Sequence, residues 1–264
     1  MKGLTVAALR LELDSDASDA IDGRQIRAVA FQEVRLDYVR RVLTQLGRPV
    51  GEARTLVVGS GRGLLARGLA RLGLDITAVD PSPAATHLAE AEAAREGLRI
   101  VHRIASAERM GLTAGEFDLV VCADTLEITD DLDGVLGEIA ALLRPGGVIV
   151  YDTVNRTPIS RLIYLGVFQT FRGTRIMPSG RYSSRRLRRP DELVAALEWH
   201  GLRNEDICSF KPKDPRSLVR AVLARRRGEI TDEQIPAIVD FVLEPEGHPI
   251  VTYLGHALKG QPSA

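Results

Sequence analysis

Three closely spaced glycines, Gly59, Gly61 and Gly63, stand about twenty residues before Asp80. Glycine lets a backbone turn sharply and approach a ligand closely. A carboxylate at this distance is suited to accept hydrogen bonds from the ribose hydroxyls of a cofactor. The pattern therefore predicts a nucleoside-cofactor site, and its alternative is a glycine turn in an α/β protein that binds no ligand.

Four other side chains could accept a proton during catalysis: Asp124, Glu127, Tyr182 and His248. Carboxylates and imidazole are common general bases, and removing the proton of a phenol with a pKa near 10 favours its attack. Asp124 and Glu127 could instead hold Mg²⁺, which prefers oxygen ligands, or cap the helix that follows them. For His248 the alternative is an exposed loop histidine.

Alternating strand and helix patterns must position these groups. Short apolar runs predict strands, and apolar residues at helical spacing predict the helices between them. This alternation predicts an α/β fold, a doubly wound and mostly parallel sheet with helices on both faces. The expected strands are 55–59, 75–79, 99–104, 117–122 and 148–153, and the expected helices are 24–46, 64–72, 83–96 and 132–143.

The second half of the chain is less regular. We predict helices at 160–171, 191–200, 215–227 and 232–243, and strands at 202–210 and 250–258. About forty residues separate the last two strands, and a connection this long is often functional. We interpret 24–264 as a single domain with helical lid insertions at about 156–190 and 212–248, preceded by a flexible arm at 1–23. The alternative for the long connection is a packing extension or a homodimer contact.

Composition restricts the partners and the compartment. The 264 residues contain 35 Lys+Arg and 35 Asp+Glu, which argues against nucleic-acid binding. Residues 155–189 contain nine arginines and no acidic residue, which predicts either a solvated basic face or contact with an anionic substrate or a membrane surface. The two cysteines and the lack of a secretory or transmembrane pattern predict a soluble, cytoplasmic protein.

The spacing of the glycine loop separates two cofactors. A dinucleotide site expects a third glycine where this chain has Leu64, whereas the compact Gly61-Arg62-Gly63, together with Arg-Pro-Gly-Gly at 144–147, resembles class I methyltransferases. Over roughly 30–210 the chain is similar to the UbiG-type O-methyltransferases of ubiquinone biosynthesis. The motifs that carry this resemblance lie in order at 31–39, 59–63, 122–127, 144–147, 153–158, 177–180 and 189–193.

The resemblance implies S-adenosylmethionine as the cofactor, S-adenosylhomocysteine as the product and a seven-stranded Rossmann-like sheet. Arg35 would pair with the methionine carboxylate of the cofactor, and Asp80 would bind its ribose. The residues beside the adenine would be Ser106, Ala107 and Glu108, with Ala123 closing the pocket. The remaining implied cofactor residues are Gly59, Ser60, Gly61, Gly63 and Pro81.

Two family histidines are missing. The family carries Glu-His where this chain has Glu127-Ile128, and Gly-Thr-His where it has Gly180-Arg181-Tyr182. In the family the first histidine belongs to an acidic cluster proposed to hold a divalent cation, and Asp124 and Glu127 remain at two of its positions. A divalent cation therefore stays an alternative to a site without metal.

These observations predict an S-adenosylmethionine-dependent methyltransferase that acts on a hydroxyl of a hydrophobic or aromatic small molecule. The missing histidines argue against ubiquinone precursors and favour a tailoring step in specialised metabolism. One alternative is methylation at carbon or nitrogen, because a fold does not fix the accepting atom. Another is a cofactor-binding pseudoenzyme or accessory subunit, and a third possibility for the basic segment is peripheral membrane association.

Overall fold

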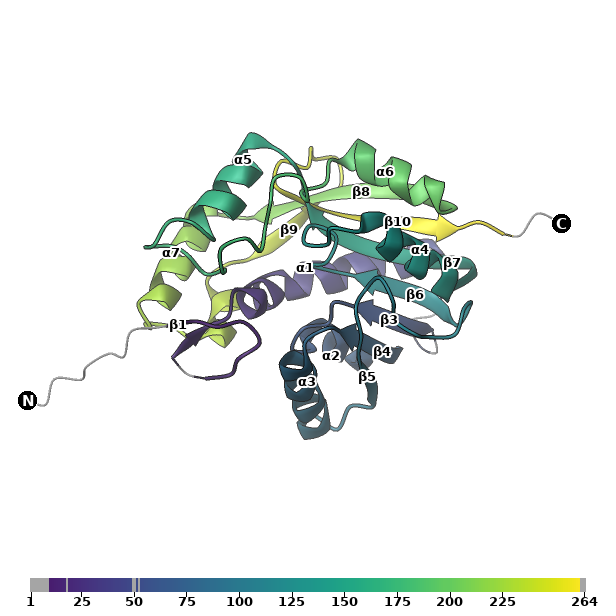
Figure 1. Ribbon diagram of the computed structural model, residues 1–264, viewed down its shortest axis with the longest axis horizontal. Helices are drawn as coiled ribbons and strands as arrows, with labels where there is room; N and C mark the ends of the chain where they lie inside the picture. Colours follow the sequence, from purple (N-terminus) through teal and green to yellow (C-terminus); the bar gives the residue numbers. More distant parts are fainter. Residues whose placement is uncertain (1–9, 18, 49–50, 52, 262–264) are drawn as a thin grey trace, which may run out of the picture.

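A computed structural model describes residues 10–17, 19–48, 51 and 53–261. Its main sheet has eight strands in the order β5-β4-β3-β6-β7-β10-β8-β9 (Figure 1). The strands β3 to β7 are parallel, whereas β10 runs antiparallel to both β7 and β8, and β9 runs antiparallel to β8. Their bounds are β3 Arg54–Val58, β4 Asp75–Asp80, β5 Ile100–Ile104, β6 Phe117–Cys122, β7 Leu143–Val154, β8 Leu202–Pro212, β9 Phe241–Glu244 and β10 Thr252–Lys259.

The strand order reverses between β3 and β6. In open α/β sheets, ligands bind at the carboxyl ends of the strands beside such a reversal. The glycine loop follows β3 and Asp124 follows β6, so the reversal brings the two predicted groups of residues to one edge. Both strands are almost entirely buried and apolar, as a parallel sheet covered on both faces requires.

Helices cover both faces of this sheet. Residues of α1 and α2 share one apolar core with Val57, Ile76 and Val121, whereas residues of α4 and α6 share a second core with Leu56 and Val120. The helix bounds are α1 Gly23–Gln45, α2 Leu64–Arg71, α3 Pro83–Arg95, α4 Leu132–Leu142, α5 Pro158–Arg161, α6 Pro190–Trp199 and α7 Pro215–Arg226. In Figure 1, α5 and α7 lie together at the left, and α4 and α6 lie at the upper right.

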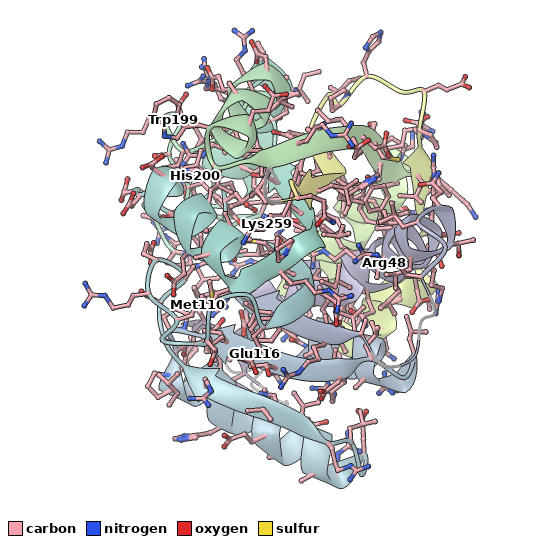
Figure 2. The ribbon with its side chains drawn as sticks, turned by 90° about the vertical axis from the view of Figure 1, so that its right-hand side faces the viewer. Arg48, Met110, Glu116, Trp199, His200 and Lys259 are labelled. Carbon is pink, nitrogen blue, oxygen red and sulfur yellow. The ribbon has the colours of Figure 1, made fainter. Side chains whose placement is uncertain are left out.

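Polar contacts hold helices and strands together near the edge of the sheet that lies opposite the glycine loop. Figure 2 labels some of the residues there. His200 Nε2 lies 2.7 Å from Asp133 Oδ1 and joins the end of α6 to α4. Lys259 donates to the carbonyl oxygen of Leu143 at 2.6 Å, and Arg48 donates to that of Asp118 at 3.3 Å. Trp199 beside His200 is 82% exposed. These residues stabilise the frame that holds the other edge.

The predicted α/β class and its doubly wound sheet are confirmed, but the sheet has eight strands where seven were expected. The extra strand is β9, which pairs with the edge of β8. The predicted helix at 232–243 is wrong: a 3₁₀ helix, η2, covers Asp232–Ala237, and β9 follows. Pro236 lacks the N–H that a continuing α-helix needs. The predicted helix at 160–171 is instead α5 continued by a π-helix, η1, over Leu162–Val167.

The described part of the expected arm is packed against the domain rather than loosely held. Two short parallel strands, β1 (Arg10–Leu11) and β2 (Ala20–Ile21), pair with each other. Both residues of β2 are buried, and Asp22 caps α1 by accepting hydrogen bonds from the backbone of Arg24 and Gln25. The rest of this expected arm, 1–9 and 18, lies outside the described residues. Among the helices that are described, none is long and apolar enough to cross a bilayer.

Candidate functional site

The loop after β3 forms one wall of a cavity. Gly59 and Gly61 have φ angles of +69° and +54°, a region that favours glycine. A side chain on Gly59 would overlap the Thr125 hydroxyl, so only glycine allows the loop to lie against the residues after β6. The predicted cofactor residues that line this cavity are Gly59, Ser60, Gly61, Arg35 and Ala123.

Asp80 ends β4 with its carboxylate buried beside the loop. It accepts hydrogen bonds from the backbone N–H groups of Gly61 at 2.8 Å and Ser82 at 2.9 Å. It also accepts from Arg24 at 2.6 Å, and Arg24 forms a second ion pair of 2.6 Å with Asp14. Sequence reasoning missed Arg24, which lies 56 residues from Asp80 and carries no motif.

The other predicted cofactor residues do not line this cavity. Gly63 caps α2, and a side chain there would press on Ala89 of α3. Pro81 is exposed at the end of β4. The residues expected beside the adenine follow β5, where Ser106 is exposed and Glu108 accepts a hydrogen bond from Thr129 at 2.8 Å. Their contacts with a cofactor, like those of Ala107, stay predictions.

Beside the cavity, two arginines of α1 bind two buried carboxylates and the half-buried carboxylate of Asp124. Arg27 lies 2.6 Å from Asp124 and 2.8 Å from Glu127. Arg35 lies 2.7 Å from the same oxygen of Asp124 and 2.5 Å from Asp152 on β7. We call these five residues the ion cluster. Arg35, predicted to bind the cofactor carboxylate, is therefore already paired with two carboxylates of the chain, and its cofactor contact stays a prediction.

Burial and ion pairing shift the pKa values of the three carboxylates in different directions. Burial alone would raise the pKa of Asp124, but Arg27 and Arg35 outweigh it and lower that pKa to about 2. Burial raises the pKa of Glu127 and of Asp152 above their ordinary values, and the arginines only partly offset it. Asp124 is thus the carboxylate that the two guanidinium groups hold ionised.

The acidic residues do not fit a resident divalent cation in this arrangement. Oxygens of Asp124, Glu127 and Asp152 lie within 4.8 Å of one another, a spacing that could hold a metal ion. Arg27 and Arg35 instead occupy these oxygens as counter-ions. Two guanidinium groups already offset most of the negative charge that a cation would neutralise.

Tyr182, predicted as a candidate base, lies on this cluster. Its hydroxyl accepts a hydrogen bond from Arg27 at 3.0 Å. Burial raises the pKa of the Tyr182 phenol above its ordinary value of 10, so the phenol is protonated at neutral pH. Tyr182 is therefore suited to hold Arg27 rather than to remove a proton.

A second, larger cavity is lined by a neighbouring face of α1 and is almost entirely apolar. Its wall includes residues from both predicted lid segments, and Arg27 lines it. His248 also lines it, is exposed, and has no hydrogen bond with the ion cluster. The structure thus brings Asp124, Glu127 and Tyr182 together but leaves His248 apart from them.

Comparisons with known proteins place the chain among methyltransferases. A family profile described as a methyltransferase domain matches residues 56–151. The ubiquinone biosynthesis O-methyltransferase of Xanthomonas axonopodis pv. citri (strain 306) is 36% identical over 187 residues, covering 70% of this chain and 75% of that protein. The protein of the same name from Xanthomonas euvesicatoria pv. vesicatoria (strain 85-10) is 35% identical over the same shares.

Solved structures share the fold at lower identity. Magnesium protoporphyrin IX methyltransferase from Synechocystis PCC 6803, with bound S-adenosylhomocysteine, has a TM-score of 0.57 at 16% identity over 90% of this chain and 86% of that one. The YcgJ protein from Bacillus subtilis has a TM-score of 0.59 at 16% identity, covering 87% and 99%. These likenesses concern the arrangement of helices and strands.

Proposed function

The chain belongs to the UbiG-type family of class I S-adenosylmethionine-dependent methyltransferases, and we propose that it methylates a hydroxyl on a hydrophobic, aromatic small molecule. The observation that carries this proposal is the pair of cavities lined by neighbouring faces of α1. One carries the glycine loop, beside which Asp80 lies, and the other is apolar and lined by Arg27. S-adenosylmethionine supplies the methyl group from its sulfonium when it is bound.

Residues of the first cavity are suited to that cofactor. The loop at 59–61 offers close backbone approach, Asp80 offers a carboxylate at the end of β4, and Arg35 and Ala123 complete the wall. Asp80 must exchange its contact with Arg24 for the ribose hydroxyls, because Arg24 now holds the same carboxylate.

The second cavity supports a hydrophobic acceptor. Its apolar wall favours an apolar ring system and excludes water, and fixing two reactants side by side supplies much of the acceleration of a displacement reaction. Asp124 and Glu127 do not line this cavity but bind Arg27, which does. We assign these two carboxylates the role of positioning Arg27.

The first test is calorimetric titration with S-adenosylhomocysteine. We expect micromolar binding by the wild-type protein, a loss of at least about tenfold in Asp80→Asn, and no change in Asp75→Asn, an exposed aspartate at the start of the same strand. Absence of binding by well-folded wild-type protein would contradict the cofactor assignment. Incubation with a panel of phenols, read by mass spectrometry, then identifies acceptors.

A tailoring role in specialised metabolism is part of the proposal, and it rests on the two missing histidines. Methylation of carbon or nitrogen, and a role as accessory subunit, remain the alternatives. Mass spectrometry of the product distinguishes the methylated atoms, whereas an accessory subunit alone gives no product with any acceptor of the panel.

The reduced thiols of Cys122 and Cys208 support a cytoplasmic location. Analytical ultracentrifugation measures the oligomeric state, for which a homodimer is one alternative.

We further propose that the mouth of the apolar cavity contacts an anionic membrane surface. Five large apolar side chains near it are at least half exposed, and Ile159, Val219 and Ile250 of these also line the cavity. The other two are Leu162 and Phe171. Exposed apolar groups beside arginines are typical of peripheral membrane contact. We expect sedimentation with anionic vesicles that weakens with salt and falls in Leu162→Asp, and an unchanged variant would contradict it.

A further inference from the structure

Arg27 is a buried cation in the wall of a mostly apolar cavity, whose lining also includes Lys211, Glu244 and His248. Its side chain is 4% exposed and lies on α1 between the cavity and the carboxylates of the ion cluster. The rings of Phe31, Tyr164 and Tyr182 have their centroids 5.3, 5.1 and 5.9 Å from its guanidinium carbon. These aromatic rings and the burial separate the charge from bulk water.

The hydrogen-bond donors of Arg27 are only partly satisfied. Its terminal nitrogens bind Asp124, Glu127 and the Tyr182 hydroxyl. Its Nε is buried and has no hydrogen-bond partner among the described residues. A buried donor without a partner is unfavourable unless a ligand completes it. Because Arg27 also lines the apolar cavity, a ligand with an acceptor oxygen there is a means of completing this buried donor.

The two guanidinium groups of the cluster serve different cavities. Arg35 lines the cofactor cavity, Arg27 lines the apolar one, and both bind the same oxygen of Asp124. The shared carboxylate holds Arg27 next to the boundary between the cavities. An acceptor molecule in the apolar cavity whose oxygen binds Arg27 would thus present that oxygen toward the cofactor cavity.

We propose that Arg27 is a catalytic residue that binds the acceptor oxygen as its anion, taking the part of a divalent cation. The inference rests on the proposed function. The acceptor O–H bond breaks, its proton leaves to water, and the guanidinium compensates the negative charge that remains on oxygen. A cation near an acid typically lowers the acid's pKa by one to three units, so a phenol with a pKa near 10 is ionised to a useful fraction at neutral pH.

A structural role for Arg27 makes a different prediction. If Arg27 served only to neutralise Asp124 and Glu127, its loss would lower stability but leave the ionisation of a bound phenol unchanged. The decisive measurement is therefore the pKa of a bound phenol, and it needs no turnover.

The test uses 4-nitrophenol, whose anion absorbs visible light, bound to the full-length protein in the presence of S-adenosylhomocysteine. Absorbance titration over pH should give an apparent pKa at least about one unit below that of the free probe. Arg27→Met should abolish this lowering. Arg225→Met is the matched control, because Arg225 is equally buried and forms a 2.6 Å ion pair with Asp232 but lines neither cavity. A folded Arg27→Met that still lowers the probe pKa would overturn the proposal.

Arg27→Lys covers the case in which Arg27→Met fails to fold. Lysine keeps the charge but lacks the Nε donor and the planar fork. We expect affinity for the 4-nitrophenolate to fall about tenfold in Arg27→Lys at constant S-adenosylhomocysteine affinity, and unchanged probe affinity would overturn the proposal. Failure of the proposed function would be seen separately. The protein would either fail to bind S-adenosylhomocysteine or methylate no acceptor, while the pKa of the bound probe would still depend on Arg27.

Discussion

Asp124 is held in a backbone conformation that a residue other than glycine rarely adopts. Its φ angle is +53°, and such a conformation typically costs about 1 to 3 kcal/mol. Its backbone N–H donates to Asp152 at 3.1 Å, and its carboxylate binds both arginines of the ion cluster. These contacts fix the residue that follows β6 and through it the two guanidinium groups.

The lowered pKa of Asp124 predicts how stability depends on pH. A carboxyl whose pKa is lower in the folded state stabilises the protein above its unfolded pKa, and this contribution is lost as the pH falls toward the folded value. With a folded pKa of about 2, we expect Asp124 to contribute about 2 kcal/mol above pH 4 and progressively less toward pH 2. Urea unfolding of wild-type and Asp124→Asn proteins measures the difference, and a difference that is constant from pH 2 to 6 would contradict this.

Removing Arg27 should create a metal site. Without its charge, oxygens of Asp124, Glu127 and Asp152 remain within 4.8 Å of one another with one counter-ion fewer, and hard cations prefer such ligands. We expect Arg27→Ala to bind Mn²⁺ at least about tenfold more tightly than the wild type in electron paramagnetic resonance titrations. The double variant Arg27→Ala/Glu127→Gln should lose that gain. Equal Mn²⁺ affinity in wild type and Arg27→Ala would count against the counter-ion role of Arg27.

At the level of single residues, the sequence identified only part of the site. Asp124 and Glu127 could be singled out because they follow a recognisable strand, and Asp80 because of its distance from the glycine loop. Arg27 and Asp152 could not, because their partners lie 100 and 117 residues away along the chain. Pairing over such distances is decided by the fold, and one arginine among many carries no local signal.

Among the elements, the segment before α1 has the clearest effect on the cofactor cavity. Asp14 and Asp22 line this cavity, and Asp14 binds Arg24, which in turn holds Asp80. Burial would lower the pKa of Arg24, but Asp80 and Asp14 outweigh it, so the guanidinium is charged and competes for Asp80. We therefore expect cofactor binding through Asp80 to displace a contact made by the first turn of α1.

Arg24→Ala should strengthen cofactor binding. When the competing guanidinium is absent, Asp80 is free to accept the ribose hydroxyls, and we expect S-adenosylhomocysteine affinity to rise about tenfold in calorimetry. Arg62→Ala, which alters a half-buried arginine of the same cavity that makes no contact with Asp80, is the control. Weaker binding by Arg24→Ala would show instead that Arg24 holds the cofactor.

Elements with a simple apolar period were predicted nearly to the residue. The strand at 117–122 and the helix after it are examples, because a strand buried on both faces and a helix buried on one face each leave a clear apolar pattern. The segment 232–243 misled this reasoning, since its apolar residues suit both a helix and the short β9. Pro236 and the open edge of β8 decide in favour of the strand, and an edge in a sheet is visible only once the sheet is assembled.

For the whole molecule, the main feature is that the two cavities share no lining residue. Filling one should therefore leave the other intact. We expect Leu218→Trp, on α7, to raise the KM for a phenolic acceptor about tenfold by occupying the apolar cavity, while S-adenosylhomocysteine affinity stays unchanged. Initial rates and calorimetry measure the two effects. A parallel loss of both affinities would mean that the cavities are coupled.

The α/β class was predictable because alternating strands and helices allow few topologies. The acceptor cavity was only outlined, as lid segments at 156–190 and 212–248. Its wall combines α1 with residues from both segments, and such a cavity depends on how the segments pack rather than on any pattern within them.

One helix forms a wall of both cavities, and this restricts how the gene can change. Arg24, Ala28 and Arg35 face the cofactor side of α1, whereas Arg27, Ala30 and Phe31 face the other. A one-codon insertion or deletion within this stretch of α1 would rotate the residues after it by about 100° relative to those before it, and would turn part of one wall away from its cavity. We therefore expect α1 to tolerate changes of length less well than substitutions outside these lining residues.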